Sequence, residues 1–336
     1  MVLDRFVKKL SKNSRVLFLA HAGADVDSIA SAFALSDSLP VAGTVGYPDH
    51  CNRNALQLVQ SLSIKTLKNP VLDRFDAVVL VDFHSFSHAG SLSDSLREYE
   101  KPILVLDHHE KDSKDLIKTP FLSCEPESVS ASVVVFNELQ KAKIVPSKKA
   151  LLAIAAGIMS DSALLHRANA EALQVLAVCL QKTKSDFNSI PELFSVKEDL
   201  SERIAKLHSA RRMRLVEVNG FLVALSHVNY FESEAAAALV TLGADVAFVA
   251  GVEHDSELLR LNARCGNEFL AQTRVNLGRL VLQLPSFFGG HGSGHQGAAG
   301  FNAFHADPQV VLQKALELLI LDLKGKGEIA IKEIVS

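Results

Sequence analysis

The stretch LVLDHHEKD, residues 104–112, joins an apolar run to one aspartate and two adjacent histidines. A short, continuous apolar run is typical of a strand that is buried on both faces of a sheet. Similar runs precede it at 15–20 (RVLFLA), 41–47 (VAGTVGY) and 76–82 (DAVVLVD). Taken alone, an Asp-His-His after a strand is most simply a surface turn. Its meaning therefore depends on which residues follow the neighbouring strands.

Segments with helical spacing of apolar residues alternate with these strands and continue after them. They lie at 28–39, 128–142, 146–159 and 170–183. Strands that alternate with helices predict an α/β fold, in which helices cover both faces of a parallel sheet.

A second, smaller α/β unit is predicted after residue 215. Its strands are expected at 221–228, 244–253 and 257–265, its first helix at 232–242, and a glycine-rich loop at 288–300. The charge-rich segment between the two units has a helical pattern and no residues that require chemistry. The sequence thus predicts a first domain at 1–183, a helical connector at 184–215 and a second domain at 216–336.

The composition is that of a globular protein with two domains. The chain has 336 residues, of which 48% are hydrophobic and 22% are charged. A net charge of −3 argues against a long basic groove for duplex DNA. Four scattered cysteines without a C-x-x-C pair indicate reduced thiols, and the apolar run near the N-terminus is too short for a signal or membrane segment. We expect a cytoplasmic protein with no membrane partner.

Acidic and imidazole side chains end or follow the strands predicted at 15–20, 76–82 and 104–107, and another follows the helix at 146–159. In chain order they are His21, Asp25, Asp27, Asp82, Asp107, His108, His109 and Asp161. Because the carboxyl ends of parallel strands meet at one edge of a sheet, where ligands bind, we expect most of these residues to share one site.

Each of these residues also has an ordinary structural interpretation. Asp25 and Asp27 could cap the helix that follows them, and His21 could be a histidine satisfied at a strand end. Helix caps, however, have no reason to coincide with every strand end, so a cluster is favoured. Carboxylates crowded together raise the cost of ionising one another, and a pair of divalent cations resolves this conflict.

Carboxylate and imidazole ligands without a thiolate suit Mn²⁺, with Mg²⁺ or Co²⁺ as substitutes. Two such ions about 3.5–4 Å apart can activate a bridging water and clamp the oxygens of an in-line displacement at phosphorus. Phosphoryl chemistry is therefore the first functional expectation.

The sequence resembles the DHH phosphoesterase family, named for the motif that Asp107, His108 and His109 match. The family's first motif, His-x-Asn-Pro-Asp-x-Asp-Ser, is similar to HAGADVDS at 21–28, except that Gly23-Ala24 replaces Asn-Pro. Asp82 and GIMSDSALLH at 157–166 match its other two aspartate motifs. No expected metal ligand is missing.

The resemblance implies a role for each residue of the cluster. By this resemblance, His21 and Asp25 would bind the first metal ion, and Asp27, His108 and Asp161 would bind the second. Asp82 would bridge the two ions. His109 would contact the phosphate, and Asp107 would orient the imidazoles.

The segment GGHGSGHQGAAG, residues 289–300, resembles the end of the domain that usually accompanies this family. Arg264 resembles the arginine of its Ser-x-Arg pattern, with Asn262 in place of the serine, whereas Arg260 could equally form a surface salt bridge. The residues that would bind the substrate phosphate are Arg264, Gly289, Gly290, His291, Gly294 and His295. His291 and Ser293 are additions to the family pattern. The substrate is expected to bind between the two domains.

These features favour a manganese-dependent phosphoesterase that converts short single-stranded RNA or DNA to 5′-mononucleotides and also acts on 3′-phosphoadenosine 5′-phosphate. The alternatives are a cyclic-dinucleotide phosphodiesterase, a single-strand exonuclease of the RecJ type and, from another class, a non-catalytic nucleotide-binding regulator. The preferred nucleotide, the direction of exonuclease digestion and the oligomeric state stay open. A homodimer is one alternative for the oligomeric state.

Overall fold

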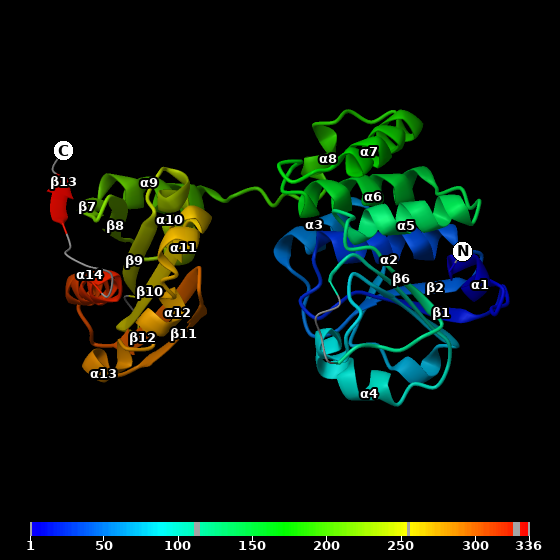
Figure 1. The fold of residues 1–336 in the computed structure, drawn as a ribbon, viewed down its shortest axis with the longest axis horizontal. Coiled ribbons are helices and arrows are strands. Elements are labelled where there is room, and N and C mark those ends of the chain that lie inside the picture. The colour runs from blue at the N-terminus through cyan, green and yellow to red at the C-terminus, as the bar shows by residue number, and fades with distance from the viewer. Residues whose placement is uncertain (1, 111–114, 254–255, 325–329, 335–336) are drawn as a thin grey trace. The chain divides into compact units, whose positions relative to one another are not determined.

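A six-stranded parallel sheet forms the centre of the first half of the chain in a computed structural model (Figure 1). The structure describes residues 2–110, 115–253, 256–324 and 330–334. The chain divides into two compact units between Val196 and Lys197, and each is described here by itself. The α/β fold predicted from the sequence is confirmed in both units.

The order of the strands in the first unit is β3-β2-β1-β4-β5-β6. Their bounds are β1 (Arg15–Leu19), β2 (Ala42–Tyr47), β3 (Thr66–Lys68), β4 (Ala77–Val81), β5 (Ile103–Asp107) and β6 (Phe121–Cys124). The chain runs outward from β1 to β3 and then returns to place β4 on the other side of β1. Strand order therefore reverses between β1 and β4, and such a switch point is where open α/β sheets bind ligands.

Helices cover one face of this sheet and short 3₁₀ and α turns cover the other (Figure 1). The covering helices are α2 (Val26–Ser38), α5 (Ala131–Lys141) and α6 (Lys148–Asp161), and η1 (Leu72–Arg74), η2 (Phe86–Leu92) and α4 (Ser93–Arg97) lie on the opposite face. Along β1, Val16 and Phe18 face the helices while Leu17 and Leu19 face the other layer. This period of two explains why the strand is apolar throughout.

The remaining helices of the first unit are α1 (Val2–Val7), α3 (Arg53–Ser61), α7 (Ala170–Thr183) and α8 (Ser189–Glu192). Ile190 of α8 is fully buried in the core of this unit. The segment predicted as a connector thus contributes its first part to unit 1. Its later part, α9 (Leu200–Arg211), packs on unit 2, where Ser226 Oγ donates a hydrogen bond to Ser209 O at 2.8 Å.

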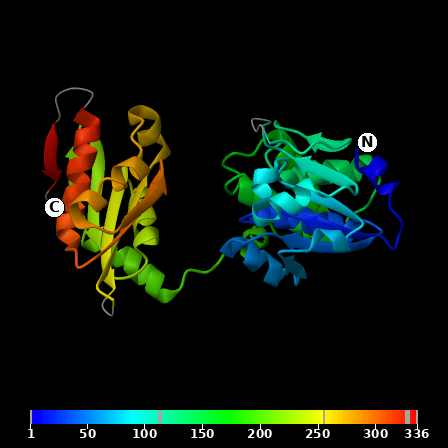
Figure 2. The same cartoon turned by 90° about the horizontal axis from the view of Figure 1, so that it is seen from below.

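The second unit contains a seven-stranded mixed sheet in the order β11-β12-β10-β9-β8-β7-β13, in which only β8 and β9 pair in parallel. The bounds are β7 (Arg214–Val218), β8 (Phe221–His227), β9 (Val246–Glu253), β10 (Leu258–Cys265), β11 (His291–His295), β12 (Ala298–Phe304) and β13 (Ile331–Ile334). Residues of α9 and α10 (Glu232–Thr241) pack on one face. On the other face lie α11 (Asn267–Thr273), α12 (Leu277–Val281), α13 (Pro285–Phe288) and α14 (Pro308–Lys324), the last running along the sheet in Figure 2.

The glycine-rich segment is a β-hairpin, so the prediction of a loop at 288–300 is wrong. Strands β11 and β12 pair in antiparallel register, with Gly294 opposite Ala299. A Cβ on Gly294 would lie 2.5 Å from Ala299 Cα, and one on Gly292 would lie 2.9 Å from Val281 O. The glycines therefore let a strand approach its neighbours closely, a use that the sequence pattern does not distinguish from a flexible loop.

Candidate metal centre

The cluster expected from the sequence assembles at the switch point of the first sheet. Leu19 at the end of β1 is level with Leu80 in β4, so the chain leaves both strands at the same edge. His21 follows the end of β1 by two residues, and Asp82 follows the end of β4 by one. The parallel arrangement of the two strands thus brings together side chains that are 61 positions apart.

The first group consists of His21, Asp25 and Asp82, whose ligand atoms all lie within 4.8 Å of one another. His21 Nε2 is 3.6 Å from Asp25 Oδ1 and 3.5 Å from Asp82 Oδ2. Its other ring nitrogen, Nδ1, is 2.9 Å from Ala22 O. With Nδ1 donating to this carbonyl, Nε2 offers its lone pair to the group, which is the usual orientation of a metal-ligating histidine.

Asp25 has two roles that the sequence presented as alternatives. It is the N-cap of α2, where Oδ1 accepts a hydrogen bond from Ser28 N at 2.9 Å and the serine hydroxyl pairs with Asp25 N at 3.0 Å. This reciprocal capping box fixes the side chain at the start of the helix. The cap interpretation is therefore correct for Asp25, and the cap also places the carboxylate beside His21.

The second group consists of Asp27, His108 and Asp161, again within 4.8 Å. His108 Nε2 is 3.5 Å from Asp161 Oδ2, and His108 Nδ1 is 3.1 Å from Ser128 O, the same pattern as in His21. Asp27 is buried, and its carboxylate accepts hydrogen bonds from the backbone N–H groups of Ala131 at 2.6 Å and of the following residue at 3.0 Å. These N–H groups have no partner within the helix because they lie in the first turn of α5, where a negative charge is favourable.

Asp161 is the last residue of α6, two residues beyond the helix end predicted at 159. The three residues Ala163, Leu164 and Leu165 then adopt positive φ values of 51°, 53° and 75°. Left-handed backbone in residues other than glycine is costly and concentrates at functional sites. Arg167 closes this turn by donating to Asp161 O at 2.9 Å.

Asp82 stands between the two groups. Its Oδ2 faces His21, and its Oδ1 is 3.3 Å from His108 Nε2. The residue is 5% exposed, has a φ of 67°, and its Oδ1 has no hydrogen-bond partner among the described residues. A buried carboxylate oxygen without a donor is unfavourable unless a cation neutralises it. The donor set and this orphaned atom both fit divalent metal ions.

The charges of the cluster point the same way. Burial would lower the pKa of His21, but the carboxylates of Asp25 and Asp82 outweigh burial and raise it to about 11. Burial also works against the charged form of His108, yet Asp82 and the other carboxylates raise its pKa to about 9. Burial raises the pKa of Asp27 well above its usual range. Without metal, bound protons therefore compensate the negative charge, and a divalent cation would replace them.

Asp107 and His109 lie beside the cluster. Asp107 is completely buried at the end of β5, and its Oδ1 is 2.8 Å from His109 Nδ1. His109 is the most exposed imidazole of the site, with a side chain that is 52% exposed, and its Nδ1 lies 3.7 Å from Asp82 Oδ1. With Nδ1 turned to Asp107 and the side chain half exposed, Nε2 is the ring nitrogen that remains to meet a substrate.

Two residues that support this centre were not predicted from the sequence. His84 is buried, and its Nδ1 forms a hydrogen bond with Asp107 Oδ2. It lies two positions after Asp82, in a segment that mixes apolar and polar residues, so the sequence pattern did not single it out. Gly157 lies on α6, where an added Cβ would be 2.6 Å from Asp27 Oδ1. A glycine within a long apolar helix could have indicated this close approach.

His109 also lies within 4.8 Å of Asp82 and His108, and a separate set of potential ligands consists of His84, Asp107 and Cys124. Its atoms are already engaged, since Asp107 accepts from two imidazoles and Cys124 Sγ donates to His109 O at 3.1 Å. We assign no metal to it.

The second unit brings together only part of the predicted phosphate-binding set. A pocket of about 350 Å³ is lined by Asn262, Arg264, Ser293, Gly294, His295, Ala298, Ala299 and Gly300. Arg264 donates to Ser233 Oγ at 2.8 Å, which holds the guanidinium in place. Arg260 instead forms the alternative salt bridge, 3.0 Å from Glu253 Oε2.

Gly289, Gly290 and His291 do not line this pocket, as far as the described residues show. They lie at the far end of β11, where His291 pairs with Asn302, whereas His295 pairs with Ala298. At about 3.4 Å per residue, four residues of strand separate the two histidines by roughly 14 Å. A phosphate role for these three residues stays a prediction without geometric support.

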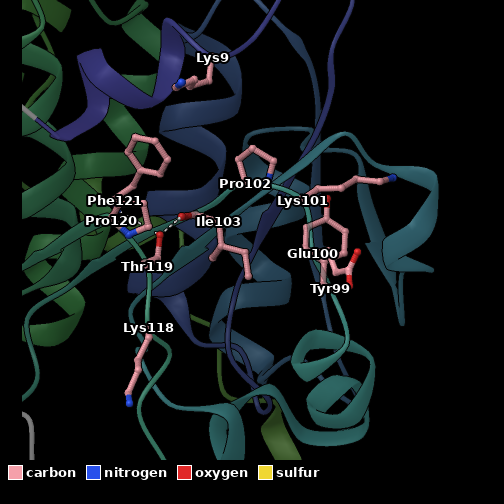
Figure 3. Close-up of a pocket in the computed structure, with 10 residues that line it drawn as sticks. All are labelled: Lys9, Tyr99, Glu100, Lys101, Pro102, Ile103, Lys118, Thr119, Pro120 and Phe121. Carbon is pink, nitrogen blue, oxygen red and sulfur yellow. Dashed lines mark hydrogen bonds between the residues drawn. The ribbon is translucent and has the colours of Figure 1, made fainter.

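Another pocket, of about 440 Å³, lies at the amino ends of β5 and β6, opposite the candidate centre (Figure 3). Lys9, Lys101 and Lys118 line it, but their amino groups point in different directions (Figure 3). Lys101 Nζ is also bound to the carbonyls of Asp73 and Phe75, at 2.9 and 2.6 Å. This pocket offers no converging charges, and we assign it no role.

Within the described parts of the chain, every helix is too short or too polar to span a bilayer.

Comparison with known proteins gives relatives over nearly the whole chain. Residues 15–158 match the DHH family, N-terminal domain. An uncharacterized protein of Methanocaldococcus jannaschii is 32% identical over 303 residues, which are 87% of this chain and 88% of the relative. A second uncharacterized protein of that organism is 26% identical over 305 residues, 86% of this chain and 58% of its own.

Two solved structures share the fold. An exopolyphosphatase-related protein from Bacteroides fragilis superposes with a TM-score of 0.63 at 18% identity, covering 96% of both chains. The DHH domain of a member of the s1p family of ribosomal proteins gives a TM-score of 0.51 at 12% identity, over 95% of this chain and 88% of its own. With its matching first unit, its His and Asp cluster and a relative along most of its length, the chain belongs to the DHH family.

Proposed function

We propose that this protein is a manganese-dependent phosphodiesterase that hydrolyses short single-stranded oligonucleotides to 5′-mononucleotides and acts on 3′-phosphoadenosine 5′-phosphate as a second substrate. The observation that carries the proposal is the position of Asp82, whose two carboxylate oxygens face two separate groups of ligands, 3.5 Å from His21 Nε2 and 3.3 Å from His108 Nε2. This is the arrangement that a two-ion centre needs.

Two bound divalent cations would supply Lewis acidity, which activates water and neutralises charge on the phosphate oxygens. His21 and Asp25 would hold one ion and Asp27, His108 and Asp161 the other, with Asp82 shared. The imidazole and carboxylate donors favour Mn²⁺, with Mg²⁺ or Co²⁺ as substitutes.

His109 would contact the phosphate and handle a proton. The hydrogen bond to Asp107 is the largest cause that raises the pKa of His109, so its ring is readily protonated. A protonated imidazole whose outer nitrogen faces the substrate can stabilise the charge on the phosphate and give a proton to the leaving oxygen. Asp107 would hold the ring in that orientation.

A small pocket in the second unit supports a short or small substrate. Arg264, fixed by Ser233, offers a guanidinium beside the backbone of Gly294 and His295. A guanidinium binds phosphate through two parallel hydrogen bonds, which suits one terminal phosphate. The net charge of −3 provides no general attraction for a long polyanion.

The test is a manganese-dependent time course on a 5′-phosphorylated dinucleotide, beside a long single strand, a cyclic dinucleotide, 3′-phosphoadenosine 5′-phosphate and inorganic polyphosphate. Preferential loss of the dinucleotide is expected. Equal loss of the long strand would indicate a general exonuclease, and preference for the cyclic dinucleotide or for polyphosphate would assign the site to those substrates. Failure to hydrolyse any of them, with metal bound, would favour a nucleotide-binding regulator.

A further inference from the structure

A buried aspartate links the histidine that faces the substrate to a second, hidden histidine. Asp107 Oδ1 accepts hydrogen bonds from His108 N at 2.8 Å and His109 N at 3.3 Å, as well as from His109 Nδ1 at 2.8 Å. Its other oxygen, Oδ2, pairs with Nδ1 of His84. The carboxylate therefore uses both oxygens, and His84 is the partner that reaches it from a different strand end.

His84 is held firmly. It is 5% exposed, and its backbone carbonyl accepts a hydrogen bond from Ile117 N at 2.8 Å. Phe83 and Ser85 on either side of it are also buried. The hydrogen bond between His84 and Asp107 therefore lies in the interior of the unit.

We propose that His84 is a positioning residue, which fixes the carboxylate of Asp107 and, through it, the orientation of the His109 imidazole. The inference rests on the proposed function in that His109 is taken to meet the substrate. Without the donor from His84, Asp107 Oδ2 would be left buried without a partner, which is unfavourable for a charged oxygen. The carboxylate would then rotate or admit water, and the bond from Oδ1 to His109 would loosen.

The two imidazoles assigned to metal binding are held by partners other than Asp107. The ring of His108 is oriented by its own bond to Ser128 O, 3.1 Å from Nδ1, and not by Asp107. His21 is likewise oriented by the carbonyl of Ala22. Loss of the His84 donor should therefore disturb His109 and leave both metal-ligating imidazoles in place.

The chain allows a matched pair of variants. His84→Leu keeps much of the buried volume and removes the donor. His84→Asn keeps an amide N–H at about the distance of Nδ1 from the backbone, so it should restore the bond to Asp107. If His84→Leu fails to fold, His84→Gln takes its place, because its amide nitrogen corresponds to Nε2 and not to Nδ1.

The first measurement is made on metal-free protein with ¹⁵N-labelled histidine, by following the low-field imidazole N–H resonances by NMR. The wild type should show signals from His84 and His109 bonded to Asp107. His84→Leu should shift or broaden the His109 signal, and His84→Asn should leave it in place. A His109 signal that does not respond to His84→Leu would overturn the proposal.

The second measurement uses the manganese-loaded protein. Turnover by His84→Leu should fall about 10–100-fold, as is typical when a residue that orients an active group is lost, while the manganese affinity stays unchanged. His84→Asn should recover most of this loss. Parallel losses of turnover and manganese affinity, or no recovery in His84→Asn, would refute a role through His109. If the wild type hydrolyses none of the substrates but the NMR coupling is present, the proposed function fails and the positioning role stands.

Discussion

Replacement of Asp82 by asparagine is the sharpest test of the two-ion centre. Asparagine tolerates the left-handed backbone that Asp82 adopts at a φ of 67°, so Asp82→Asn preserves the turn better than Asp82→Ala would. The amide is neutral and offers only one acceptor oxygen. It therefore cannot serve both groups, which Asp82 now approaches at 3.3 and 3.5 Å.

The expected size of the effect follows from the charge that is lost. Metal ions provide several kcal/mol of charge stabilisation in the transition state, and loss of about 4 kcal/mol lowers the rate about 10³-fold. We expect kcat on the 5′-phosphorylated dinucleotide to fall by at least this factor. Metal analysis after desalting should show fewer ions per chain than in the wild type.

A control variant comes from the other end of the same strand. Asp76 precedes β4, has a side chain that is 42% exposed, and pairs with Arg15 at 3.3 Å. Asp76→Asn also removes one carboxylate but should leave kcat and metal content unchanged, since exposed ion pairs contribute little to stability. Wild-type turnover by Asp82→Asn, with its full metal content, would refute the assignment of Asp82 as the bridge.

Three further predictions concern stability, pH and substrate binding. Chelation should lower the midpoint of thermal unfolding, because an ion at 100 times its Kd adds about 2.7 kcal/mol per site to the free energy of unfolding; calorimetry that shows no change would contradict a metal site. Burial raises the pKa of Asp161, so its ionised form opposes folding above that pKa. In metal-free protein, Asp161→Asn should therefore increase stability to urea at pH 7. The gain should vanish at low pH, where Asp161 is protonated in both the folded and the unfolded protein. An equal gain at low pH would show that the raised pKa of Asp161 is not its cause. Arg264→Ala should raise KM about tenfold or more and change kcat little, whereas Arg260→Ala, whose side chain pairs with Glu253, should change neither; an unchanged KM for Arg264→Ala would argue against its role.

The parallel sheet and the cluster could be predicted because they depend on patterns of few residues. Apolar runs that end in aspartate or histidine specify both the strands and the edge at which they end, as in β4 and β5. The short edge strands β3 and β6 were missed, since three or four residues with partial burial carry little signal. The hairpin of the second unit was missed because glycine favours both turns and close approach.

The supporting residues of the site were harder to predict than its ligands. The ligands recur at strand ends, whereas His84 matters only through one buried bond to Asp107. That bond joins residues at the ends of two different strands, so it cannot be predicted from the residues around His84 in the sequence. Asp25 differs from His84, because it was predicted but with two alternative interpretations. It both caps α2 and lies beside His21 in the cluster, and the sequence alone could not establish that both hold.

The position of the cluster at the switch point also has a consequence for the order of folding. Its ligands come from the ends of β1, β4 and β5 and from the end of α6, so they span residues 21 to 161. During synthesis, the centre cannot assemble until the central strands have paired and α6 has docked. Metal uptake should therefore be a late event in the folding of the first unit, and an ion that binds only the assembled centre makes the completed unit harder to unfold.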